Sequence, residues 1–339
     1  MANQQPPRFA TSGFDGRHYH NPVPTEVMKK GAFFRVLGKY MKRHEGRVPA
    51  TSPGPFSVDL EVLNNLPPDT LRVTWLGHSG SLLEVDGRRF LTDPLWCERA
   101  SPVSFAGPRR FFQNPLPLAD LPPVDCLLLS HDHFDHLDKE SVLFLCLQKK
   151  IPVITMRGVG KRLTRWGVPA AQVAELDWWE ATSRIDGFTV TAAPARHFSG
   201  RSLTDRFTTL WGSFAIRGPR HNVYFGADSG YYDGFGAIGE ALGPFDLTML
   251  EIGAYDPEWS TIHMGPEGAV NAWKDIGSGL LMPIHWGTFN LALHAWTQPV
   301  ESIVALAKAN DIPLLLPRPG ETRTVADGEW VSGWWRGES

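Results

Sequence analysis

Four apolar segments of this 339-residue chain are each followed by side chains of the types that bind metal ions. The junctions are residues 124–129 before His131, His133, Asp135 and His136; 188–193 before His197; 222–225 before Asp228; and 280–284 before His285. Short apolar runs of this length are typical of buried strands. If the carboxyl ends of these strands lie along one edge of a sheet system, seven ligand-type side chains converge there. Few folds satisfy that condition.

The spacing inside the first cluster favours two metal ions. His131 and His133 are two residues apart, so in an extended chain both rings project from the same side and can reach one ion. Asp135 and His136 follow as the chain turns and would address a second ion. Imidazole and carboxylate suit Zn²⁺, and ions about 3.5–4 Å apart can share a bridging carboxylate. We therefore expect two divalent metal ions, with zinc preferred, although Mn²⁺ and Fe²⁺ accept the same ligands.

The cluster is costly to explain without a metal. A single buried histidine is more often an ordinary core residue than a ligand. Several strongly hydrophilic groups within six residues after a buried strand, however, would lose hydration without compensation. The local pattern therefore favours a metal site over a structural role.

The remaining pattern predicts one α/β domain over residues 68–335. Short apolar strands alternate there with turns and helical stretches, and Asp86-Gly87 is a strong hairpin signal. The expected strands are residues 71–76, 81–85, 88–92, 124–129, 188–193, 209–216, 222–225, 247–252, 280–284 and 313–316, and the expected helices are 139–149, 266–275 and 299–309. Residues 1–67 show little strand pattern and are expected to form an N-terminal extension.

Charge and composition exclude some partners and leave a membrane surface open. The formal net charge of −3 argues against a nucleic-acid enzyme. Within the extension, residues 27–43 have the spacing of a basic amphipathic helix, which can lie on an anionic membrane or pack on its own domain. The N-terminus lacks the apolar core of a signal peptide, and no apolar run reaches the ~18 residues of a membrane span. We expect a cytoplasmic protein, with peripheral contact at the inner membrane surface as an alternative.

The metal-ligand motifs resemble those of the metallo-β-lactamase fold. His131-x-His133-x-Asp135-His136, followed by His197, Asp228 and His285 in that order, carries the resemblance. It implies a four-layer αββα sandwich with a dinuclear site along one edge of two packed sheets. It also implies that His131, His133 and His197 hold one metal, that Asp135, His136 and His285 hold the other, and that Asp228 bridges them.

A narrower resemblance points to one branch of that family. The motifs that carry it include Thr74-Trp75-Leu76-Gly77-His78, Leu91-Thr92-Asp93-Pro94, Glu175-Leu176-Asp177-Trp178-Trp179 and Ile284-His285-Trp286-Gly287-Thr288-Phe289. They resemble the N-acylphosphatidylethanolamine-hydrolysing phospholipase D enzymes and their bacterial relatives. This implies hydrolysis of a lipid phosphodiester to phosphatidic acid and a fatty acid ethanolamide.

Two alternatives remain beside that activity. Ile262 and Pro319 differ from the residues that the phospholipases carry at those places, so a lactonase or other carboxylic-ester hydrolase on the same metal site is the first alternative. The second is a non-catalytic sensing or scaffold protein of the same fold. All seven ligand positions are filled, which favours an enzyme.

Further residues receive roles as hypotheses. Asp228 would position the nucleophilic water, and His263 would protonate the leaving group or hold the phosphate. Asp93 and Asp132 would support the ligands by hydrogen bonds. Arg109 and Arg110 would contact the phosphate. His78 receives no role, and neither metal identity nor oligomeric state follows from the sequence.

Overall fold

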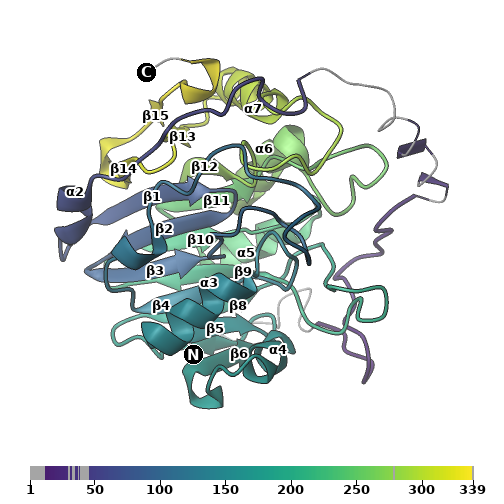
Figure 1. Ribbon diagram of the computed structural model, residues 1–339, viewed down its shortest axis with the longest axis horizontal. Helices are drawn as coiled ribbons and strands as arrows, with labels where there is room; N and C mark the ends of the chain where they lie inside the picture. Colours follow the sequence, from purple (N-terminus) through teal and green to yellow (C-terminus); the bar gives the residue numbers. More distant parts are fainter. Residues whose placement is uncertain are drawn as a thin grey trace.

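A computed structural model places two β-sheets face to face, with helices on both outer faces (Figure 1). It describes residues 12–29, 31–32, 35–36, 38, 46–277 and 279–337. The expected four-layer αββα sandwich is confirmed. The helix expected over residues 27–43 lies largely outside the described residues. No helix in the described part of the chain is long and apolar enough to cross a bilayer.

The larger sheet contains seven strands among the described residues. In sheet order these are β14 (Thr322–Thr324), β1 (Leu71–Gly77), β2 (Gly80–Val85), β3 (Arg88–Thr92), β4 (Cys126–Leu129), β5 (Val153–Met156) and β6 (Val173–Leu176). The pairs from β14 to β3 are antiparallel, and those from β3 to β6 are parallel. The carboxyl ends of β3 and β4 therefore point to the same edge.

The smaller sheet contains six strands in the same part of the chain. In sheet order these are β12 (Leu280–Ile284), β11 (Leu247–Glu251), β10 (Asn222–Phe225), β9 (Ser213–Arg217), β8 (Thr189–Ala193) and β7 (Ala181–Thr182). The strands β10, β11 and β12 are parallel to one another, while β9 is antiparallel to both β10 and β8. It follows that β8, β10, β11 and β12 all run in one direction.

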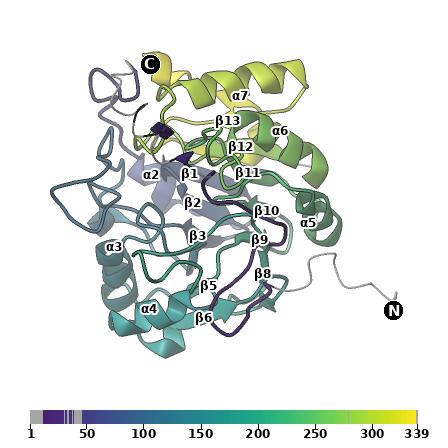
Figure 2. The ribbon, with the colours of Figure 1, turned by 90° about the vertical axis from the view of Figure 1, so that its right-hand side faces the viewer.

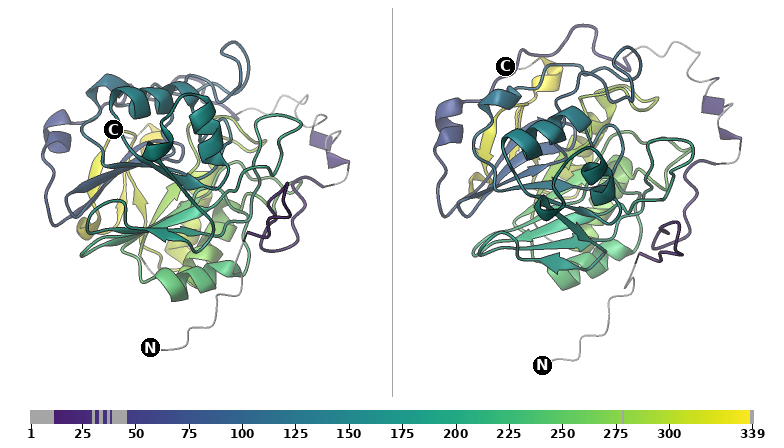
Figure 3. Two further views of the ribbon diagram at one scale, coloured as in Figure 1. Left: turned by 90° about the horizontal axis from the view of Figure 1, so that it is seen from below. Right: turned by 60° about the horizontal axis from the view of Figure 1, so that its bottom comes forward.

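Helices cover the outer face of each sheet, as the two views of Figure 3 show. On the side of the larger sheet these are α3 (Lys139–Leu143), continued by a π-helical turn (Phe144–Gln148), and α4 (Val159–Arg165). On the side of the smaller sheet they are α5 (Gly234–Leu242), α6 (Gly265–Ile276) and α7 (Gln298–Ala309). Shorter elements are α2 (Leu60–Asn64), the 3₁₀ turns Leu118–Asp120, Ala170–Gln172, Val325–Asp327 and Trp334–Arg336, and the small pair β13 (Leu315–Leu316) and β15 (Trp330–Val331).

The core lies between the sheets and under the helices. Parallel strands that are covered on both faces read as continuous apolar runs, and Cys126–Leu129 of β4 is buried at every position. Fully burying a side chain such as Leu127 stabilises the fold by about 1.5–3 kcal/mol. This apolar packing holds the strand ends in fixed positions, which a site built on several strands requires.

Three predicted strands begin two or more residues later than expected: β4 and β13 by two residues each, and β9 by four. The sequence predicted a strand over 209–216, but β9 begins at Ser213. The residues before it use their backbone groups elsewhere, since Leu210 N donates to the Arg157 carbonyl and Gly212 N donates to the Ser130 carbonyl. The segment before β9 therefore joins the smaller sheet to the loop that follows β4.

Candidate metal centre

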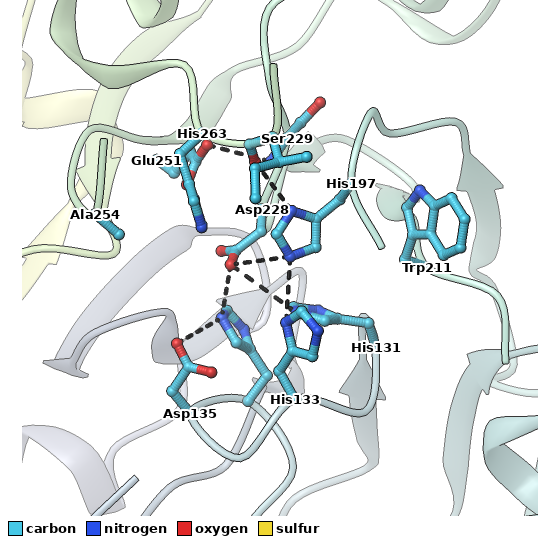
Figure 4. Close-up of polar contacts among 12 residues, drawn as sticks. His131, His133, Asp135, His197, Trp211, Asp228, Ser229, Glu251, Ala254 and His263 are labelled. Carbon is cyan, nitrogen blue, oxygen red and sulfur yellow. Dashed lines mark hydrogen bonds and ion pairs between the residues drawn. The ribbon is translucent and has the colours of Figure 1, made fainter. Parts of the chain in front are cut away.

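The expected ligand side chains meet at one edge of the two sheets (Figure 4). His131 follows β4 of the larger sheet, whereas His197, Asp228 and His285 follow β8, β10 and β12 of the smaller sheet. These strands end at the same edge because they run in the same direction within each sheet. The site therefore lies between the sheets, with ligands from both.

Three histidines form the first group. His133 Nδ1 lies 3.0 Å from His131 Nε2 and 3.2 Å from His197 Nε2. The other ring nitrogens are held from behind: His197 Nδ1 donates to the Ile262 carbonyl at 2.9 Å, and His131 Nδ1 lies 2.9 Å from Ser130 Oγ. The Nε2 atoms of His131 and His197 are thereby directed toward the same point, beside His133 Nδ1. This is the arrangement that a metal-binding imidazole needs.

The second group gathers around the Asp135 carboxylate. Its Oδ2 lies 3.3 Å from His285 Nε2 and 3.5 Å from His136 Nε2. His78 Nε2 lies 3.0 Å from the same oxygen, and the His78 and His285 ring centres are 4.0 Å apart. His78, which the sequence left without a role, is therefore part of this group.

Asp228 lies between the two groups. Its Oδ2 is 3.1 Å from His136 Nε2 and 3.2 Å from His285 Nε2, on the side of the second group. The same oxygen is 3.7 Å from His197 Nε2 and 3.9 Å from His131 Nε2, on the side of the first. Figure 4 shows the Asp228 carboxylate pointing toward the rings of His131 and His197. This is the position that a bridging carboxylate would occupy.

The electrostatics of the cluster call for positive charge. Burial would lower the pKa of His136, but the Asp228 and Asp135 carboxylates raise it well above the usual value. Burial also opposes the charged form of His285, yet Asp228 and Asp135 raise the pKa of His285 to about 10. Burial would raise the pKa of Asp228, yet the His136 and His285 rings hold it far below its usual range. The acids therefore stay ionised and attract a cation.

The buried atoms of the cluster fit a metal. Burial, reinforced by neighbouring rings, lowers the pKa of His131 and of His197, so both are neutral, which is the form that binds metals. Among the described residues, His136 Nε2, which faces the Asp135 and Asp228 carboxylates, is buried without a well-aligned hydrogen-bond partner. Such atoms are costly to bury unless something satisfies them. Divalent cations bound by His and Asp would do so.

Strained backbone supports the site. His78, Asp93, Ala227 and His285 have positive φ angles of 55°, 33°, 49° and 63°. A left-handed conformation costs about 1–2 kcal/mol for a residue other than glycine. Strain of this kind concentrates where function requires a particular geometry. These residues all belong to the strand ends around the site.

One glycine permits a close approach of two site loops. A Cβ on Gly230 would lie 1.9 Å from the Thr261 carbonyl oxygen. Any larger residue would push the loop that carries Asp228 away from the segment that leads to His263. Gly230 is therefore required by packing.

Asp93 and Asp132 act differently. Asp93 is buried and accepts hydrogen bonds from His136 Nδ1 at 2.7 Å and from Ser130 N at 2.8 Å, so it touches a ligand directly. Asp132 instead accepts from Gly200 N at 2.7 Å and from Arg162 at 2.9 Å. Asp132 therefore ties the loop after His197 to the loop after β4, and these bonds go to a backbone N–H and to Arg162 rather than to a ligand ring.

His263 lies beside the cluster with a buried acid behind it. Its Nδ1 is 2.7 Å from Glu251 Oε2, and its ring centre is 5.1 Å from that of His197 and 5.3 Å from that of His285. Glu251 also accepts from Met264 N at 2.9 Å. Glu251 could not be recognised from the sequence as a site residue, because it is the last residue of the buried strand β11.

The structure does not bring the two arginines into the site. Arg109 is exposed and pairs with Glu98 at 2.6 Å. Arg110 is half-buried, and its guanidinium donates to the backbone carbonyls of Leu95 and Leu76 at 2.8 and 3.1 Å. Its donors are used within the protein, so the expected phosphate contact has no support in this geometry.

The chain is similar to known metal-dependent hydrolases. Residues 88–286 match the family described as Beta-lactamase superfamily domain. An uncharacterized protein of Mycobacterium tuberculosis is 46% identical over 342 residues, covering 98% of this chain and 88% of that protein. N-acyl-phosphatidylethanolamine-hydrolyzing phospholipase D 1 of Caenorhabditis elegans is 38% identical over 252 residues, covering 71% of each chain.

A solved structure supports the same fold. The metallo hydrolase Igni18 from Ignicoccus hospitalis superimposes with a TM-score of 0.58 at 23% identity, covering 76% of this chain and 98% of that one. The convergence of His and Asp side chains at the sheet edge agrees with these matches. The chain therefore belongs to the metallo-β-lactamase superfamily of metal-dependent hydrolases.

Proposed function

We propose that the protein is a dinuclear metal-dependent phosphodiesterase of the phospholipase D type. Its substrate would be N-acylphosphatidylethanolamine or a related lipid phosphodiester. The observation that carries the proposal is the 38% identity over 252 residues to the Caenorhabditis elegans phospholipase, which covers 71% of each chain. The match of residues 88–286 to the Beta-lactamase superfamily domain supports hydrolytic chemistry but not a particular substrate.

The geometry suggests how the ligands would be shared. His131, His133 and His197 would hold one ion, and Asp135, His136 and His285 would hold the other, with Asp228 between them. When bound, divalent ions such as Zn²⁺ lower the pKa of water toward ~7 and neutralise charge on phosphoryl oxygens. Asp93 would keep the His136 ring oriented throughout.

The reaction needs one proton for the leaving group. The oxygen of water forms a bond to phosphorus, and the bond from phosphorus to the ethanolamide oxygen breaks. His263 would donate a proton to that leaving oxygen, and the proton lost by water restores the balance. Because Glu251 accepts from Nδ1 of His263, the ring is fixed with Nε2 left for proton transfer.

The first experiment measures hydrolysis and metal together. Purified protein should contain about two equivalents of a divalent transition metal by elemental analysis. It should release phosphatidic acid and an acyl ethanolamide from N-acylphosphatidylethanolamine in mixed micelles, detected by mass spectrometry. It should also release p-nitrophenol from bis(p-nitrophenyl) phosphate.

Asp228→Asn should abolish turnover and lower metal content. Asp125→Asn is a matched control, because Asp125 lies at the opposite end of β4 and contacts Arg88 and Arg89 rather than the cluster. It should keep both metal and activity. Hydrolysis of a lactone but of no phosphodiester would overturn the substrate, and wild-type protein without metal would overturn the mechanism.

A further inference from the structure

A segment near the N-terminus lies against the loops that carry the site residues. Tyr19 N donates to the Phe207 carbonyl at 2.8 Å, in the loop that follows His197. Further along, Thr261 Oγ1 donates to the Glu26 carbonyl at 2.6 Å, and Lys29 N donates to the Glu258 carbonyl at 3.0 Å. In Figure 2 the dark purple segment crosses the side of the molecule at which β8, β9 and β10 are drawn.

Asn21 forms two hydrogen bonds with the backbone of His197, one of the proposed ligands. Its Nδ2 donates to the His197 carbonyl at 2.7 Å, and its Oδ1 accepts from His197 N at 2.9 Å. His197 lies beyond the end of β8, where no strand in the described part of the chain pairs with it. One amide side chain thus supplies both hydrogen bonds that a strand partner would give. The peptide groups on either side of the His197 Cα are held, which sets the direction of the Cα–Cβ bond, while the Ile262 carbonyl holds the ring through Nδ1.

The neighbouring residue extends the same connection to Asp228. Arg196 Nη2 donates to the Pro24 carbonyl at 2.8 Å, and its Nε donates to Thr25 Oγ1 at 3.0 Å. The Arg196 backbone meanwhile accepts from Gly230 N at 2.8 Å. The segment is therefore bonded to the loop of His197 and, through Arg196, to the loop that follows Asp228.

We propose that Asn21 is a positioning residue of the metal centre. Residues 19–26 would then be part of the active site, although they precede the matched family domain, which begins at residue 88. The inference rests on the proposed metal site but not on the identity of the substrate. Groups that orient a ligand typically change metal affinity about 10- to 100-fold when removed.

The test compares variants of the full-length chain. Asn21→Ala should weaken binding of the Zn²⁺ ion held by the group that contains His197 about 10- to 100-fold, measured in competition with a chromophoric chelator. Asn21→Asp keeps the acceptor for His197 N but faces the His197 carbonyl with a carboxylate oxygen, so it should also weaken Zn²⁺ binding, and it serves if the alanine variant does not fold. The unfolding midpoint of the metal-free protein should fall by the same amount in Asn21→Ala as in the control variant described next. A difference in zinc affinity between the two variants is then not a difference in stability.

Asn114→Ala is the matched control. Asn114 is also half-buried, accepts from Leu116 N at 3.0 Å and donates to the Leu95 carbonyl at 3.3 Å, yet it contacts no residue of the cluster. It should keep wild-type zinc affinity. Equal affinity in wild type, Asn21→Ala and Asn114→Ala would overturn this inference and leave the proposed function standing. A lower zinc affinity in Asn21→Ala would support the positioning role of Asn21 even if the wild-type protein hydrolysed no phosphodiester.

Discussion

His136 is held from both ends: its Nδ1 lies 2.7 Å from Asp93 Oδ2, and its Nε2 lies 3.1 Å from Asp228 Oδ2. Asp93 is fully buried and is itself held by Ser130, whose N and Oγ donate at 2.8 and 2.6 Å. A carboxylate behind an imidazole fixes the tautomer and makes the free nitrogen a better metal ligand. Asp93 thus prepares His136 for its proposed role.

Asp93→Asn should therefore weaken metal binding about 10- to 100-fold. Asparagine tolerates the positive φ of Asp93, so the backbone is preserved while the charge is lost. Chelator competition measures the effect. Asp138→Asn, which removes a carboxylate bonded to Cys97 N and Ser141 Oγ instead, is the control. An Asp93→Asn protein with wild-type affinity would show that the ring needs no such support.

His78→Asn should reduce metal retention in the second group. His78 Nε2 is 3.0 Å from Asp135 Oδ2, and asparagine keeps the left-handed backbone but is too short to reach that oxygen. The stoichiometry measured after dialysis should fall from about two ions toward one, because only the group containing Asp135 is disturbed. Retention of both ions after dialysis would rule out a supporting role for His78.

His263→Ala should separate proton transfer from metal binding. General acid catalysis contributes about 10²- to 10⁴-fold, and it matters most when the leaving group is a poor one. We expect a loss of that size in kcat for the lipid substrate and a much smaller loss for bis(p-nitrophenyl) phosphate, with unchanged metal content. Glu251→Gln should reproduce the pattern more weakly. Equal losses on both substrates would argue against proton donation.

Asp86→Asn should lower stability in a pH-dependent way at the edge opposite the site. The buried Asp86 carboxylate accepts from Arg220 N, His221 N and His221 Nδ1 at 2.9, 3.0 and 2.6 Å. Burial opposes ionisation, but these hydrogen bonds lower the pKa of Asp86 below its usual value. Its stabilisation is complete above the unfolded pKa of about 3.9 and is lost as pH falls through the folded pKa.

Urea unfolding of the wild-type protein and of Asp86→Asn at several pH values measures the contribution of the Asp86 carboxylate to stability. The free energy of unfolding should differ by about 1–3 kcal/mol at pH 7, the range for hydrogen bonds to a buried charged group. The difference should shrink as pH is lowered from 5 toward 3. A difference that stays constant over that range would contradict the assignment of the effect to the carboxylate charge.

The sequence predicted the fold and the site best where an apolar run marks a buried strand and ligand-type residues follow directly after it. The strands that precede His131, Asp228 and His285 are short, apolar and fully buried, so their periodicity predicted them closely. The direction of each strand then determined where its last residues lie. The fold class and the convergence at the sheet edge follow from these features.

Contacts between distant residues could not be predicted in the same way. Asn21 and His197 are 176 positions apart, and nothing in the sequence around Asn21 marks it as a partner. Arg110 looks like a surface cation in the sequence, but it is half-buried and its guanidinium donates to backbone carbonyls. Such roles depend on which loops the packed sheets bring together, and local patterns carry no information about that.

The division of the ligands between the two sheets has a consequence for biosynthesis. A growing chain that has reached residue 136 carries only the part of the centre that follows β4, and His285 is made after most of the domain. Tight metal loading would then have to wait until the second sheet has closed onto the first. Acquisition of metal would be a late event that distinguishes finished molecules from partly folded ones.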